Sequence, residues 1–77
     1  MKINVIFFGM AADITGKNQM EFADQHDTDG FRKLLLKKYI NLNKNHFIFA
    51  LNKKIVKENT RLNNGDTIAV LPPFSGG

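Results

Sequence analysis

Apolar and polar positions alternate along the beginning of the chain, which predicts a β-strand over residues 2–8. One face of this strand carries the apolar residues 3, 5 and 7. The other face, with Ile6 and Phe8, is also largely apolar. Such a strand is typical of the centre of a sheet that is covered on both sides. A second strand is expected over 19–22, after a connection that holds a short helical turn, and pairs with the first as a hairpin.

One main helix is expected after an acidic stretch that supplies its N-terminal signals. Its apolar side chains recur at helical spacing: Phe31, Leu34, Leu35 and Tyr39. Asp27 or Thr28 is the predicted N-cap, since a side-chain oxygen there can accept a free backbone N–H of the first turn. Asp29 places a negative charge at the positive end of the helix dipole. A loop is expected over 41–45.

The second half of the chain predicts three more strands, over 47–51, 55–56 and 67–71. The last is apolar on both faces, and Pro72-Pro73 ends it because proline cannot donate to a sheet. The first and last strands are the most apolar, so they are expected side by side and parallel at the sheet centre, joined by a right-handed crossover. This order predicts an α+β fold, the β-grasp (ubiquitin-like) mixed sheet with one main helix packed across one face.

Length and composition limit the chain to one small domain. Its 77 residues hold one core, which we place at 1–73, followed by a flexible tail at 74–77. Cysteine is absent, which excludes disulfides, cysteine-ligated metals and a cysteine nucleophile. No apolar stretch approaches the ~18 residues of a membrane helix, and the first residues do not form a signal peptide. We therefore expect a cytoplasmic protein.

The charge is unevenly distributed along the chain. Residues 1–30 hold two basic and five acidic side chains, a net of −3, whereas residues 31–77 hold nine basic and two acidic ones, a net of +7. A basic half can meet nucleic acid or an acidic protein. The lysines are scattered and only two arginines occur, so a solvated lysine surface is the favoured interpretation and nucleic-acid binding is not expected.

Side chains offer little independent chemistry. His26 and His46 are isolated, and no metal site is expected from them. No phosphate-binding or dinucleotide motif occurs, and Ser75 has no evident base partner. An enzyme acting alone on a small molecule is therefore not expected, nor is a stably bound cofactor.

Gly76-Gly77 provides a different chemical group, the terminal carboxylate. A carboxylate can attack the α-phosphate of ATP to give an acyl adenylate, which then reacts with a sulfur or amine nucleophile. Glycine has no side chain and adopts any backbone conformation, so two glycines can enter a narrow partner channel. The six residues from Pro72 span at most ~20 Å. The alternative interpretation is a flexible end without function.

Four segments share the motifs of one known family. They are Phe7-Phe8 at the strand end, Leu51-Asn52 with Ile55-Val56, the Gly65-Asp66 turn within 62–69, and the Pro-Pro-x-Ser-Gly-Gly ending formed by Pro72, Pro73, Phe74, Ser75, Gly76 and Gly77. Over essentially its whole length, the chain resembles the small subunits of molybdopterin synthase, which are ubiquitin-like sulfur carriers. The Gly-Asp turn also occurs in thiamine-pathway carriers, whereas the two prolines favour the molybdopterin branch.

The resemblance implies a function and a set of partners. A partner adenylating enzyme consumes ATP to adenylate Gly77, and a sulfur donor converts the adenylate to a thiocarboxylate. The tail then enters the large synthase subunit and donates sulfur to cyclic pyranopterin monophosphate. Family members form complexes with two copies of each subunit. The positions that match the family's docking patch are Phe8, Ile55 and Leu71, with Pro72, Pro73, Phe74 and Ser75 leading to the reactive end; burial within the sheet is the alternative for the first three.

Three other functions remain open from the residues alone. The same chemistry fits a sulfur carrier for thiamine synthesis or tRNA thiolation. It also fits a protein modifier that is conjugated to lysines through Gly77. The basic second half fits a β-grasp module that binds RNA.

Overall fold

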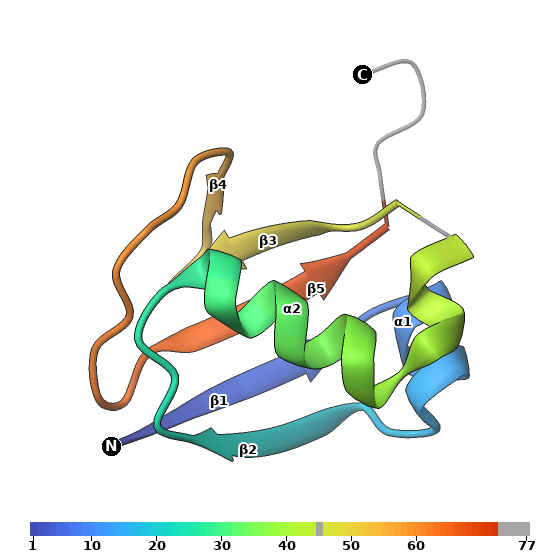
Figure 1. The fold of residues 1–77 in the computed structure, drawn as a ribbon, viewed down its shortest axis with the longest axis horizontal. Coiled ribbons are helices and arrows are strands. Elements are labelled where there is room, and N and C mark those ends of the chain that lie inside the picture. The colour runs from blue at the N-terminus through green and yellow to red at the C-terminus, as the bar shows by residue number, and fades with distance from the viewer. Residues whose placement is uncertain (45, 73–77) are drawn as a thin grey trace.

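The structure is a computed structural model that describes residues 1–44 and 46–72. The strands of the described chain form one sheet in the order β2-β1-β5-β3-β4 (Figure 1). Their bounds are β1 Lys2–Phe7, β2 Gln19–Ala23, β3 Ile48–Leu51, β4 Lys54–Val56 and β5 Thr67–Leu71. The helices are α1 Met10–Thr15, α2 Thr28–Lys38 and a 3₁₀ helix, η1, at Ile40–Lys44.

The centre of the sheet is a parallel pair formed by the first and last strands. Val5 lies opposite Ile68 and Phe7 opposite Val70, and all four side chains are buried. The remaining neighbours pair in antiparallel fashion. Since α2 crosses one face of this mixed sheet, the predicted β-grasp fold is confirmed (Figure 1).

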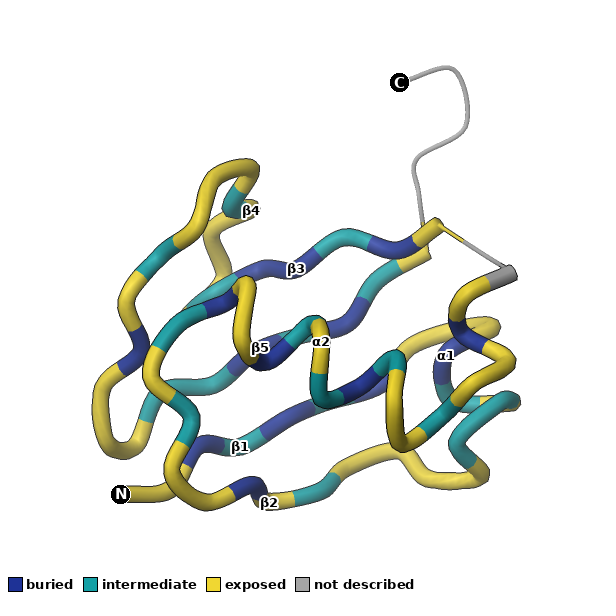
Figure 2. Tube along the Cα trace, viewed as in Figure 1, coloured by how far each residue is buried: buried dark blue, intermediate teal, exposed yellow. Residues whose placement is uncertain are grey.

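Helix α2 packs on the sheet through the apolar stripe that its sequence predicted. Phe31 and Leu35 of this stripe are fully buried between the helix and the sheet. The Phe31 ring meets Phe22 of β2 edge-on, with centroids 5.1 Å apart, and Phe49 of β3 at 5.5 Å. Figure 2 shows the buried positions along the central strands and on the sheet-facing side of α2. The helix therefore holds an edge strand and an inner strand in one core.

The start of α2 is tied to the segment that precedes β5. Of the two predicted N-caps, Asp27 is the one that forms, and its Oδ1 accepts the Gly30 N–H at 2.8 Å. Its Oδ2 accepts from the Asn59 side-chain amide at 3.3 Å. The buried Thr28 is the first helical residue and exchanges two hydrogen bonds with the Thr60 backbone, both 2.9 Å. The cap is therefore part of a tertiary contact as well as a local one.

Residues 41–44 differ from the loop that the sequence predicted over 41–45. They belong to the 3₁₀ helix η1, and Leu42 within it is only 1% exposed. A polar, asparagine-rich segment carries no amphipathic pattern, so its local preference indicated a loop. Burial of the single leucine against the core decides its conformation.

The turn between β3 and β4 joins two segments that the sequence presented as separate motifs. Asn52 and Lys53 both have positive φ, 48° and 75°, as a two-residue type I′ hairpin requires. The Asn52 Oδ1 accepts the Thr67 N–H at 2.9 Å, and its Nδ2 donates to Asp66 Oδ1 at 3.0 Å. Asp66 Oδ2 in turn accepts the Asn63 N–H at 2.7 Å. One asparagine thus fixes the hairpin to the start of β5.

Replacing Asn52 with alanine is expected to lower the free energy of unfolding by about 1–2 kcal/mol, because two hydrogen bonds and a residue suited to positive φ are lost. Urea denaturation measures this change. Asn63→Ala is the matched control, since Asn63 meets Asp66 through its backbone, and should stay within about 0.5 kcal/mol of wild type. Equal losses in the two variants would contradict the role of the Asn52 side chain.

The cap predicts a pH dependence of stability. The Gly30 N–H and then the Asn59 amide hold the pKa of the Asp27 carboxyl below its usual value. The ionised carboxylate therefore contributes stability above the unfolded-state pKa, and this contribution is lost as pH falls through the lower folded-state pKa. Asp27→Asn retains a cap acceptor without the charge. When the pH falls from 5 to 3, the urea concentration at the unfolding midpoint should drop further for wild type than for Asp27→Asn. Equal drops in the two proteins would refute this.

Candidate functional site

The sheet face opposite α2 carries a band of apolar residues, and no described element packs against it. Strand register places Ile6, Ala69, Ala50 and Ile55 in one row across β1, β5, β3 and β4. Ile55 is 45% exposed. The expectation that β1 is covered on both sides is therefore wrong for the described chain. The one long helix of the described chain can cover only one face, so apolar residues such as Ile55 on the second face are left partly exposed.

A second row lies closer to the end of β5. Phe8, one residue beyond β1, is 45% exposed, and its N–H donates to the Val70 carbonyl at 3.0 Å. Leu71 lies opposite Ile48, and both are half-buried. We call the two rows together the open face: Ile6, Phe8, Ile48, Ala50, Ile55, Ala69 and Leu71.

The open face contains all three apolar residues that the sequence predicted for partner docking. Phe8, Ile55 and Leu71 come from three parts of the chain and lie on this one surface. Sequence reasoning did not assign Ile6 or Ala69 to it. The sequence did indicate these residues, because the first and last strands are apolar on both faces. That pattern was interpreted as burial of both faces.

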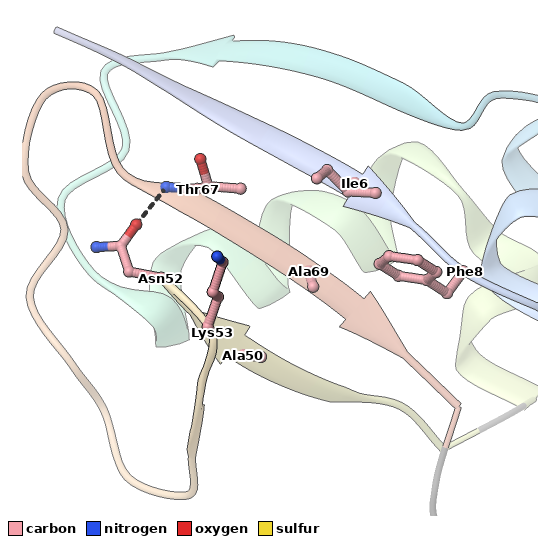
Figure 3. A pocket seen from close by; sticks show the side chains of 7 residues that line it. All are labelled: Ile6, Phe8, Ala50, Asn52, Lys53, Thr67 and Ala69. Atoms are coloured by element: carbon pink, nitrogen blue, oxygen red, sulfur yellow. Dashed lines mark hydrogen bonds between the residues drawn. The ribbon is translucent and has the colours of Figure 1, made fainter.

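The open face is hollowed at its centre (Figure 3). The hollow measures about 410 Å³ and is lined by Ile6, Phe8, Ala50, Asn52, Lys53, Thr67 and Ala69. The small side chains of Ala50 and Ala69, which lie opposite each other in the sheet, leave the space. Lys53, Thr67 and Asn52 make one end polar, whereas Phe8 marks the apolar end. The hollow can therefore accept a group that is largely apolar with one polar end.

The chain leaves the sheet beside the open face. Pro72 follows β5 and is exposed. Gly9, which follows Phe8, has φ 55° and ψ −128°, a conformation that only glycine adopts readily. A Cβ at Gly9 would lie 3.5 Å from Pro72 Cγ, so the two residues pack closely. Pro72 therefore lies at the end of the sheet where Phe8 and Leu71 are found.

The remaining predicted site residues lie outside the described residues: Pro73, Phe74, Ser75, Gly76 and Gly77. His26 and His46 are exposed. Within residues 1–44 and 46–72, no three His, Asp or Glu side chains are grouped as metal ligands would be. None of the helices there has the length and apolarity needed to cross a bilayer.

Comparison with known proteins identifies the family. The model of the ThiS family matches residues 5–77. The molybdopterin synthase sulfur carrier subunit of Caenorhabditis briggsae is 32% identical over 83 aligned positions, which cover 100% of this chain and 99% of that protein. The match thus reaches from the first strand through the glycine pair.

Two solved structures share the fold. One is a complex of subunits 1 and 2 of the molybdopterin-converting factor from Helicobacter pylori, where the similar chain is 30% identical, with a TM-score of 0.68 and full coverage of both chains. The other is a Pyrococcus furiosus protein described as a putative subunit 1 of the same factor, with a TM-score of 0.87 at 17% identity, covering 96% of this chain and 99% of that one. The second similarity concerns the fold alone. The chain belongs to the ThiS family, alongside the sulfur carrier subunits of molybdopterin synthase.

Proposed function

We propose that this chain is the sulfur carrier subunit of a molybdopterin synthase. The observation that supports this most strongly is the full-length match to curated sulfur carrier subunits, including the terminal glycines. The geometry is consistent with it, since an exposed apolar face adjoins the point where the tail leaves the sheet. The chain is a sulfur-donating subunit and not an enzyme on its own.

The proposed chemistry takes place at the Gly77 carboxylate. A partner adenylating enzyme uses ATP, and a carboxylate oxygen attacks the α-phosphate and releases pyrophosphate. A sulfur donor then displaces AMP and leaves a thiocarboxylate, which donates its sulfur to cyclic pyranopterin monophosphate in the large subunit. Cysteine is absent from the sequence, so no thiol side chain competes as the site of sulfur attachment. We propose no resident cofactor for the chain.

The open face is the proposed docking surface for the large subunit. Phe8 and Ile55 are each 45% exposed, and burying such a side chain fully contributes about 1 kcal/mol. The six residues from Pro72 to Gly77 span at most ~20 Å when extended. A partner that covers Phe8 and Leu71 therefore has its own surface within reach of the tail. Two copies of each subunit complete the proposed assembly.

Intact mass spectrometry tests the carrier chemistry. Incubation with an adenylating enzyme, ATP and a sulfur donor should exchange one carboxyl oxygen of Gly77 for sulfur. Deletion of Gly77 should abolish the exchange and leave the circular dichroism spectrum unchanged, because the described core ends before the glycines. An unchanged wild-type mass under conditions that thiolate a known carrier would refute the proposal.

Substitution of Phe8 tests the docking surface. Phe8→Glu places a charge in the apolar face and should weaken binding to the large subunit at least about tenfold, as loss of a central apolar contact does. Isothermal titration calorimetry measures this. Ile40→Glu is the control, since Ile40 is 73% exposed in η1 and lies outside the open face; it should change the dissociation constant less than about twofold. Equal affinities of the two variants would exclude this face as the docking site.

A further inference from the structure

Lys53 occupies a position that favours glycine. It is the second central residue of the type I′ turn, with φ 75°. Such turns prefer glycine there because a Cβ is unfavourable at positive φ. A side chain that is kept in a strained conformation at a surface site points to a function for that side chain.

The Lys53 side chain extends over the open face and lines the hollow. Figure 3 shows it directed from the turn across the sheet surface, on the side of Thr67 and Ala69. Within residues 1–44 and 46–72, no acidic side chain forms an ion pair with it. The Asp66 carboxylate, in the turn before β5, accepts hydrogen bonds from Asn52 and Asn63. The ammonium group is therefore available at the polar end of an apolar hollow.

We propose that the partner docked on the open face inserts one large apolar side chain over Ala50 and Ala69 and places a carboxylate against Lys53. This inference rests on the proposed function and specifies the surface chemistry of the large subunit. The hollow of about 410 Å³ has room for a leucine or aromatic side chain. The small side chains of Ala50 and Ala69 leave room for the apolar group, and Lys53 selects the carboxylate beside it.

The charge of the chain favours an acidic partner. Net charge is +4, and the excess of basic side chains lies in residues 31–77, which include the β3–β4 turn. Complementary charges at the edge of an apolar interface raise the association rate and fix the orientation of the partner. The contact with Lys53 should therefore set the register of docking, while the hollow contributes most of the affinity.

Neighbouring lysines provide a matched test of the charge. Lys54 follows Lys53 and pairs with Leu51, which places it on the α2 side of the sheet. Lys53→Gln and Lys54→Gln each remove one positive charge. Calorimetry against the large subunit at low salt should show about fivefold weaker binding for Lys53→Gln and less than twofold for Lys54→Gln. The loss in Lys53→Gln should shrink at high salt, because salt screens the ion pair.

Lys53→Gly separates stability from binding. Glycine relieves the positive φ, so the melting temperature should rise by about 4 °C, while binding weakens as in Lys53→Gln. A residue with only a structural role in the turn would show the first change without the second.

Filling the hollow tests the apolar part. The larger side chain in Ala69→Leu occupies the hollow and should weaken binding to the large subunit at least about tenfold. Ala23→Leu is the control, because Ala23 lies on the same sheet face in β2, outside the hollow. Thermal unfolding checks that both variants fold. Lys53→Gln alters no buried side chain, so it tests the proposal even where Ala69→Leu is unstable.

The outcomes distinguish the two proposals. Tight wild-type binding with selective losses in Lys53→Gln and Ala69→Leu would support this inference. Equal binding by wild type and both variants would overturn it and leave the proposed function standing. Failure of the wild-type chain to bind the large subunit, under conditions where a known carrier binds its own, would contradict the proposed function and this inference together.

Discussion

The parallel pairing of β1 with β5 is the constraint on which the rest of the structure depends. It brings the two ends of the described chain together, with Val5 beside Ile68 and Phe7 beside Val70. Because the strands run the same way, their last residues meet at one end of the sheet. The exposed Phe8 therefore lies close to Pro72, the last described residue. The proposed docking surface and the start of the proposed reactive arm are therefore brought together by one strand pair.

The open face follows from having one main helix for a two-sided sheet. Helix α2 buries one face, and the apolar residues of the open face have no cover in the described chain. Exposed apolar side chains lower the solubility of a free subunit, so their presence fits a protein that works within a complex. Lys53 shows a similar compromise, since a residue at positive φ costs about 1 kcal/mol that glycine would not. Both features lower the stability or solubility of the free chain, and a binding surface on the open face explains both.

Much of the fold could be predicted because local and tertiary preferences agree. Asp27 caps α2 as its side chain suggested, and the last strand, Thr67–Leu71, has the predicted bounds. The prediction of a loop was wrong at residues 41–44, where burial of Leu42 overrides a polar sequence. It also could not find the Asn52–Asp66 hydrogen bond, which joins turns 14 residues apart. Contacts of that kind depend on where the sheet places two loops, and no local pattern reports them.

The sequence by itself determined the elements, the order that favours a β-grasp and the chemistry available to a chain without cysteine and with a Gly76-Gly77 pair. These follow from periodicity and residue type, which are local properties. Only the tertiary structure decided which apolar face is free, because alternation marks two faces of a strand without saying which one a helix covers. It also decided that Phe8, Ile55 and Leu71 share a surface with Lys53. Register and crossover set those distances, and both arise from packing of the whole chain.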